Sequence, residues 1–250
     1  MAGHSRWANI KHKKQKSDAK RGKVFTKLVK EIMVAAKLGG SDIGSNPRLR
    51  GAVERAKSEN LPADNIDRAI KKGAGELSGV TYEEGIYEGY AAAGVAVLVA
   101  YMTDNKNRTA GDVRSIFTKN DGRFGESGSV GWIFDKKGVF TFDMASVKEE
   151  ALMEAAIEAG ADDVVRNDDD AVFEVYSDPT LFHAVKTAFD EKKLKYSVAE
   201  ISMIPKNTVK VTGGDVGKVL KLLDALEDND DVQNVYANFD ISKEDMEKVA

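Results

Sequence analysis

The hydrophobic pattern of the chain changes once, at residues 73–80 (GAGELSGV). Before this segment, apolar residues recur every three or four positions, which is typical of amphipathic helices. After it, short runs rich in Val, Ile, Phe and Tyr alternate with helical patterns, which is typical of α/β domains. The sequence therefore predicts a small all-helical domain, a linker and then α/β structure.

Three helices are expected within residues 20–75. The first, 23–37, has one apolar side and one lysine-rich side, and Gly39-Gly40 ends it. The second begins with Asn46 as N-cap and Pro47 in its first turn. The third begins at Pro62 and stops at Gly73.

Eight strands and four helices are expected in the rest of the chain. The strands are 86–90, 95–102, 129–134, 138–142, 171–176, 196–204, 208–211 and 232–239, and the helices are 109–119, 146–159, 179–192 and 215–226. With a weak strand near 163–165, residues 138–204 follow the ferredoxin-like order β-α-β-β-α-β. The predicted fold class is therefore α+β and multidomain: an N-terminal three-helix domain followed by two ferredoxin-like-style α/β sandwich domains, one inserted into the other.

This pattern predicts the following domain boundaries. They are a flexible basic arm (1–20), a helical domain (21–78), an α/β domain in two pieces (79–136 and 206–242), an inserted acidic ferredoxin-like domain (137–205) and a tail (243–250).

Charge is distributed unevenly along the chain. The formal net charge is −4, yet residues 1–30 hold ten Lys and Arg and a single acid, Asp18. Residues 143–231 hold ten basic and twenty-one acidic residues. We expect an electric dipole whose basic end attracts a polyanion while the acidic end is repelled by it.

Residues 2–16 interleave Trp7 and two histidines with Lys and Arg but lack any apolar periodicity, so this arm cannot fold alone. Its cations can neutralise phosphates, Trp7 can stack on a base, and Asn9 can bond to a base edge. The alternative is a solvated basic tail without a specific contact. The expected nucleic-acid-binding residues of the arm and helical domain are Arg6, Trp7, Asn9, Lys11, His12, Lys13, Lys14, Lys16, Lys20, Arg21, Lys23, Lys27, Arg48, Arg50, Lys71 and Lys72.

Residues 103–114 (TDNKNRTAGDVR) form a polar loop between a strand and a helix. Lys106, Arg108 and Arg114 lie beside the start of that helix and are expected to form a second phosphate contact. The alternative is structural: Asp and Asn side chains brace the turn, and Thr109 caps the helix.

Several motifs together resemble the YebC family, which includes a mitochondrial translational activator. They are AGHSRWANIKHKK, DAKRGK, NPRLR, NIDRAIKKG, YEGY, TDNKNRTAGDVR and SGSVGW, and the match runs from end to end. The resemblance implies three domains, a role in gene expression and no enzymatic activity. One departure is visible, since this chain has Ala91-Ala92-Ala93-Gly94 where relatives often carry Gly-Pro-Gly-Gly.

Other function classes receive little support. The chain has no cysteine and no apolar run of transmembrane length, so we expect a cytoplasmic protein without membrane contact, cofactor, metal ion or small-molecule substrate. The acidic run 162–170 (DDVVRNDDD) is expected to be a solvated turn. The predicted function is a non-enzymatic, nucleic-acid-binding regulator of gene expression, and the family resemblance implies that it is a DNA-binding transcriptional regulator. The alternative is a ribosome-associated translation factor that contacts ribosomal RNA, and the alternative from a different class is a metal-dependent hydrolase or nuclease.

Overall fold

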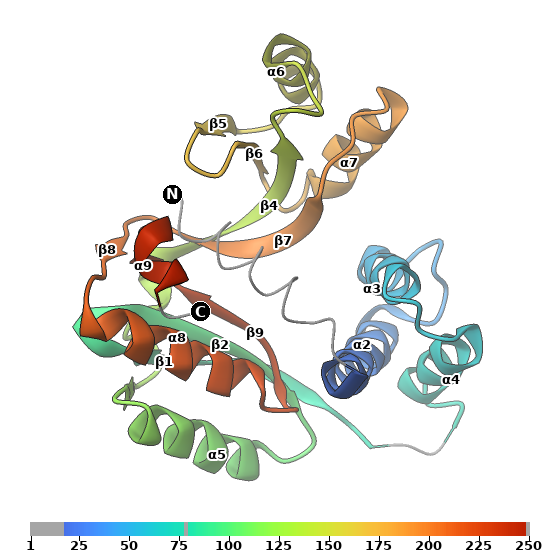
Figure 1. The fold of residues 1–250 in the computed structure, drawn as a ribbon. Helices are drawn as coiled ribbons and strands as arrows, with labels where there is room; N and C mark the ends of the chain where they lie inside the picture. Colours follow the sequence, from blue (N-terminus) through green and yellow to red (C-terminus); the bar gives the residue numbers. More distant parts are fainter. Residues whose placement is uncertain (1–17, 78–79, 249–250) are drawn as a thin grey trace.

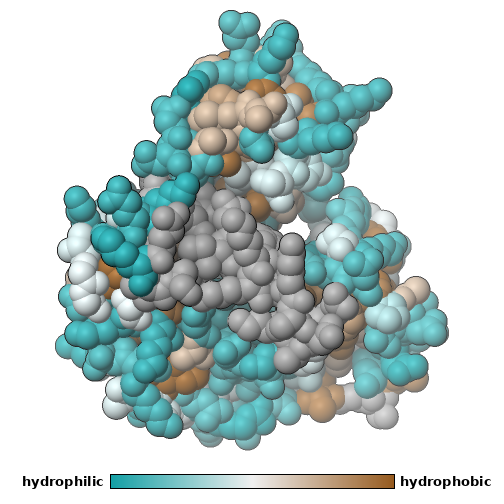
Figure 2. Space-filling model, in the orientation of Figure 1, coloured by the Kyte–Doolittle hydropathy of each residue, from teal (hydrophilic) through white to brown (hydrophobic). Residues whose placement is uncertain are grey.

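The computed structural model describes residues 18–77 and 80–248. Figure 1 shows three bodies: a group of helices (α2 to α4), a sheet backed by α5 and α8, and a second α/β body that carries α6 and α7. On the face shown in Figure 2, hydrophilic residues predominate, with apolar patches between them. The fold class is α+β and multidomain, as predicted.

The helical domain consists of α2 (Asp18–Gly39), α3 (Pro47–Ser58) and α4 (Ala63–Gly73). Its core includes Leu28, Ile32, Leu49, Val53 and Ile66. The predicted N-cap is confirmed, because the side chain of Asn46 accepts a hydrogen bond from the backbone N–H of Leu49 at 3.0 Å. The Asn46 amide also donates to the carbonyls of Ala35 and Gly40, so the same side chain closes the end of α2.

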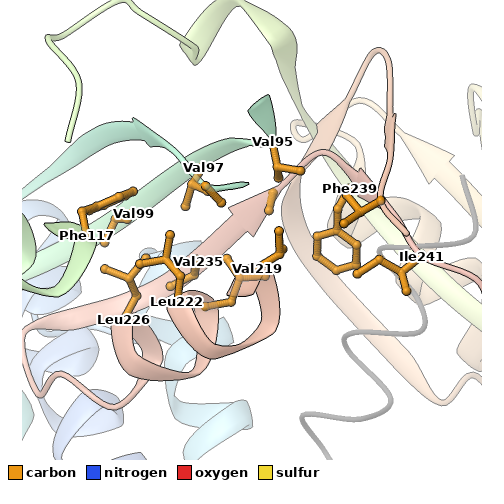
Figure 3. Packing of buried hydrophobic residues seen from close by; sticks show 14 of the residues in the cluster. Val95, Val97, Val99, Phe117, Val219, Leu222, Leu226, Val235, Phe239 and Ile241 are labelled. Atoms are coloured by element: carbon orange, nitrogen blue, oxygen red, sulfur yellow. The ribbon is translucent and has the colours of Figure 1, made fainter. Parts of the chain in front are cut away.

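The central domain contains a four-stranded sheet in the order β3-β1-β2-β9. Its strands are β1 (Glu83–Tyr90), β2 (Ala96–Thr103), β3 (Arg123–Phe124) and β9 (Val232–Ala237). The helices α5 (Lys106–Lys119) and α8 (Gly214–Glu227) cover one face. Figure 3 shows Val97 and Val99 of β2 packed against Leu222 and Leu226 of α8. Burial of alternate β2 residues on this face is what a strand period of two requires.

A short two-stranded sheet completes this domain. It pairs β8 (Val209–Lys210) in parallel with β10 (Phe239–Asp240). Residues 243–247, expected as part of the tail, form the short helix α9 (Lys243–Glu247).

The third body comprises β4 (Phe134–Asp143), α6 (Glu149–Glu158), β5 (Asp163–Asn167), β6 (Val172–Ser177), α7 (Phe182–Glu191) and β7 (Val198–Pro205). All its strand pairs are antiparallel, in the order β5-β6-β4-β7. Because β9 returns to the sheet of β1 and β2, this body is inserted into the central domain. The chain enters this body through β4 and leaves it through β7, and these two strands pair in register from Phe134↔Pro205 to Thr141↔Val198.

Three expectations about elements were wrong. Residues 129–134 do not form a strand: they contain the 3-10 helix η2 (Gly131–Ile133), because Glu88 accepts the backbone N–H groups that a ladder would need. Helix α5 begins at Lys106 with Asn105 as N-cap, so Thr109 is not the cap. The acidic run 162–170 is a turn only at residues 168–170, because residues 163–167 form β5, which pairs with β6 and confirms the weak strand expected near 163–165. The 3-10 helix η1 (Ala92–Gly94) and strand β3 were not predicted.

Candidate nucleic-acid interface

The expected site begins outside the described residues. Arg6, Trp7, Asn9, Lys11, His12, Lys13, Lys14 and Lys16 all lie there. Lys20 and Arg21 belong to the first turn of α2, but the structure does not describe their side chains. The contact predicted for the arm therefore stays a prediction.

The lysines of α2 contact the central domain. Lys23 and Lys27 donate to the backbone carbonyls of Asp228 and Glu227, at 2.8 and 2.7 Å. Lys30 donates to the carbonyl of Asp230 at 2.8 Å. These carbonyls lie at the C-terminus of α8 and in the turn that follows, where the helix dipole is negative and attracts cations. The cationic face of α2 thus contributes to docking of the helical domain.

Asp231 is the centre of a buried polar network at this junction. Its Oδ1 lies 2.7 Å from Nζ of Lys30, and its Oδ2 accepts from Arg108 and Thr109, each at 2.8 Å. Thr103 is a longer contact, at 3.2 Å. Burial of the carboxyl would raise its pKa, but hydrogen bonds from Arg108, Lys30 and Thr109 outweigh this and lower the pKa of Asp231 to about 2. The carboxylate is therefore held ionised.

Arg108 also ties the loop before α5 to this network. It contacts Asp104 at 2.6 Å in addition to Asp231, and these two carboxylates raise the pKa of its guanidinium. The side chain of Arg108 is still half exposed. Of the structural alternative for this motif, the bracing of the turn by Asn105 is confirmed and the cap at Thr109 is wrong, while the proposed phosphate contact stays untested.

Arg48 joins three elements. Its guanidinium contacts Glu31 of α2 at 2.9 Å and Glu84 of β1 at 2.6 Å. The hydrogen bond from Arg48 lowers the pKa of Glu84, although burial opposes the shift. Arg50 donates to the carbonyls of Ile43 and Gly44 in the loop before α3. Both arginines therefore have protein partners in this structure.

The remaining predicted cations lie on the surface. Lys71 and Lys72 are exposed in the last turn of α4. Lys106 is exposed at the start of α5, and the guanidinium of Arg114 lies 5.1 Å from the ring centre of Phe124. The structure brings Lys23, Lys27 and Arg108 to one junction, but that junction does not include Lys71, Lys72 or Arg114.

Sequence reasoning missed Asp231 and Glu88, two buried carboxylates that each accept several hydrogen bonds. Asp231 lies in an acidic stretch of a kind that is usually exposed to solvent. Only the short distance between its carboxylate and the ammonium group of Lys30 reveals that it forms a buried ion pair. Glu88 lies in β1, whose residues show no regular alternation of buried and exposed positions, and its burial could have been inferred only from its facing Leu98 of β2.

Two findings concern other kinds of site. In residues 18–77 and 80–248, no group of three or more His, Cys, Asp or Glu side chains is placed to hold a metal ion. Among the same residues, no helix has both the length and the apolar character needed to cross a membrane.

Comparison with known proteins identifies the family. Residues 5–76 match the model of the TACO1/YebC protein N-terminal domain, and residues 82–239 match that of the TACO1/YebC second and third domain. A protein of Citrifermentans bemidjiense is 61% identical, and one of Geobacter sulfurreducens is 59% identical, each over 100% of both chains. Both are named "probable transcriptional regulatory protein".

A solved structure has the same fold. The crystal structure of a conserved hypothetical protein from Aquifex aeolicus is 48% identical and superposes with a TM-score of 0.81, covering 90% of this chain and 93% of that one. Two domain models and full-length relatives agree, and the chain belongs to the TACO1/YebC family.

Proposed function

We propose that this protein is a non-enzymatic regulator of gene expression that binds nucleic acid through its basic arm and the outer surface of its helical domain. The observation that carries the proposal is the segregation of charge: ten basic residues and one acid in residues 1–30 precede a chain whose remainder is acidic. Such a cationic segment binds phosphates by releasing condensed counterions. The names of the full-length relatives support the regulatory role.

Because α2 is docked on the central domain, the point where the arm joins the folded protein is fixed. Residues 1–17 lead directly into α2, and Lys23, Lys27 and Lys30 hold that helix against the end of α8. The start of a helix also carries a partial positive charge. A phosphate chain bound by the arm would therefore approach the protein at the N-terminus of α2.

The helical domain extends the basic surface beyond the arm. In addition to Lys71 and Lys72, helices α3 and α4 expose three further cations: Arg55, Lys57 and Arg68. Residues 143–205 of the inserted domain hold six basic and fifteen acidic residues, and this excess of acid keeps the inserted domain away from the same polyanion. Binding in one orientation follows from this polarity.

Transcriptional regulation by DNA binding is the reading that the relatives' names support. A specific observation favours a second candidate, a translation factor that contacts ribosomal RNA. If α3 and α4 acted as a helix-turn-helix, the N-terminal part of α4 would face the bases, yet it exposes Asp64 and Asp67. Carboxylates at that place repel the DNA backbone, so the arm is the better candidate for recognition.

Binding measurements on three ligands test the proposal. The full chain and a variant that begins at Asp18 are titrated with duplex DNA, single-stranded RNA and ribosomes at 50 to 200 mM salt. If the arm and helical domain together meet about six phosphates, we expect the full chain to lose on the order of a thousandfold in affinity across this range. The shortened chain should bind far more weakly at every salt concentration. Equal affinity of the two chains for all three ligands would refute the proposal.

A further inference from the structure

Trp132 is exposed in a segment whose neighbours are buried. Val130 is fully buried and Ile133 is 8% exposed, and both pack in a cluster with Leu98 and Phe134 where the central and inserted domains meet. Trp132, between them in η2, is 66% exposed. An indole is among the most costly side chains to leave in water, so its exposure needs an explanation other than poor packing.

The segment that presents Trp132 is held rigidly. The buried carboxylate of Glu88 accepts hydrogen bonds from the backbone N–H groups of Gly128, Val130 and Gly131, each at 2.7 Å. Burial would raise the pKa of Glu88, but these three donors outweigh it and keep the pKa below its ordinary value. The loop is thus anchored by an ionised group behind it.

The indole is oriented by its own loop. Its Nε1 donates to the carbonyl of Ser129 at 3.2 Å, and the hydroxyl of Tyr90 donates to the same carbonyl at 3.0 Å. The polar atom of the ring therefore already has a partner. What Trp132 offers a ligand is its flat aromatic surface.

A cation lies at the same place. Nζ of Lys206 donates to the carbonyl of Trp132 at 3.1 Å and lies 3.2 Å from the carboxylate of Asp135. The side chain of Lys206 is 52% exposed, so its ammonium group can also meet a ligand anion. An exposed aromatic face beside a half-exposed cation is the combination that binds a base and the adjoining phosphate of a single strand.

We propose that Trp132 is a stacking platform for an unpaired nucleobase, with Lys206 contacting the adjoining phosphate. This deepens the proposed function and rests on it, because it assigns a second contact to the same nucleic acid. It also specifies the ligand, since only an unpaired base exposes a face to a side chain. An apolar pocket of a protein partner would use the same ring, but it would gain nothing from the neighbouring lysine.

Fluorescence tests the platform directly, because Trp7 and Trp132 are the two tryptophans of the chain. In a Trp7→Phe variant, the emission reports on Trp132 alone. The variant is titrated with a twelve-nucleotide uridine RNA and, as a control, with heparin, a polyanion without bases. We expect strong quenching by the RNA and little by heparin. Equal quenching by both would overturn the proposal.

Affinity gives a second readout. Trp132→Ala should weaken binding of the same RNA on the order of tenfold, while Trp132→Phe, which keeps an aromatic face, should stay within about threefold of the parent chain. Lys206→Ala should reduce the salt dependence of binding. Unchanged affinity in Trp132→Ala would refute the platform alone, provided that removal of residues 1–17 still abolishes binding. If the unmodified chain failed to bind RNA, DNA and ribosomes, the proposed function and the platform would both be wrong.

Discussion

Nζ of Lys30 lies 2.7 Å from Oδ1 of Asp231, and this buried ion pair joins the helical domain to the central domain across 201 positions of the chain. Both side chains are about 90% removed from solvent, and Asp231 has further donors in Arg108 and Thr109. Loss of either charge leaves the other charge buried without its partner, which is unfavourable.

The first prediction follows from this pair. Lys30→Ala should lower the free energy of unfolding by about 2 to 4 kcal/mol, because Asp231 keeps only part of its compensation. Urea denaturation measures the change. Lys23→Ala is the matched control, because its ion pair with Asp228 is solvent-exposed and removing it should cost less than about 1 kcal/mol. Equal effects of the two substitutions would show that the buried pair is not the stronger contact.

The second prediction concerns acid. The pKa of Asp231 is about 2 in the folded protein, against an ordinary value of 3.8. A depressed pKa contributes stability that is complete above the unfolded value and is lost as the pH falls through the folded value. We therefore expect the melting temperature to fall between pH 4 and pH 2, as measured by circular dichroism. Asp231→Asn should be less stable at neutral pH and should show a shallower decline in this window; an unaltered decline would exclude Asp231 as its source.

The third prediction tests how closely α2 and α4 approach. A Cβ added at Gly73 would lie 2.3 Å from the backbone oxygen of Met33, whereas one added at Gly51 of α3 would meet nothing within 4 Å. Gly73→Ala should therefore destabilise the protein by about 1 to 3 kcal/mol. Gly51→Ala should stabilise it by about 1 kcal/mol, because alanine has the higher helix propensity. Opposite signs in thermal unfolding are the expected result, and a stabilised Gly73→Ala would contradict the close approach.

The fourth prediction concerns the turn between β1 and β2. Ala93 has φ 58° and Gly94 has φ 77°, so two successive residues adopt the left-handed conformation. Ala93 is strained there and Gly94 is not. Ala93→Gly should raise the free energy of unfolding by about 0.5 to 1 kcal/mol, with the gain in conformational freedom of the unfolded chain offsetting part of the relief. A destabilised variant in chemical denaturation would show that the strain is small.

The sequence predicted what depends on local periodicity. The cap at Asn46 and the end of α4 at Gly73 were predictable because capping and helix termination are decided within a few residues. The inserted topology was also predictable, since its elements follow a known order.

Contacts between distant residues were not predictable in the same way. Nothing near Lys23 or Lys27 indicates that their ammonium groups meet backbone carbonyls at the end of α8. Likewise, the strand expected at 129–134 has suitable residues, but the carboxylate of Glu88 takes the N–H groups of Val130 and Gly131. In each case a partner far along the chain outweighed the local pattern.

The pairing of β4 with β7 determines how the acidic inserted domain is attached to the central domain. Eight residue pairs, from Phe134↔Pro205 to Thr141↔Val198, join the two connections into one hydrogen-bonded ribbon. A ribbon resists bending far better than two separate strands of chain would. The inserted domain is consequently attached rigidly. When the opposite end of the molecule is anchored, the negative surface of the inserted domain is held at a set distance and angle, where it can repel or bind neighbouring molecules.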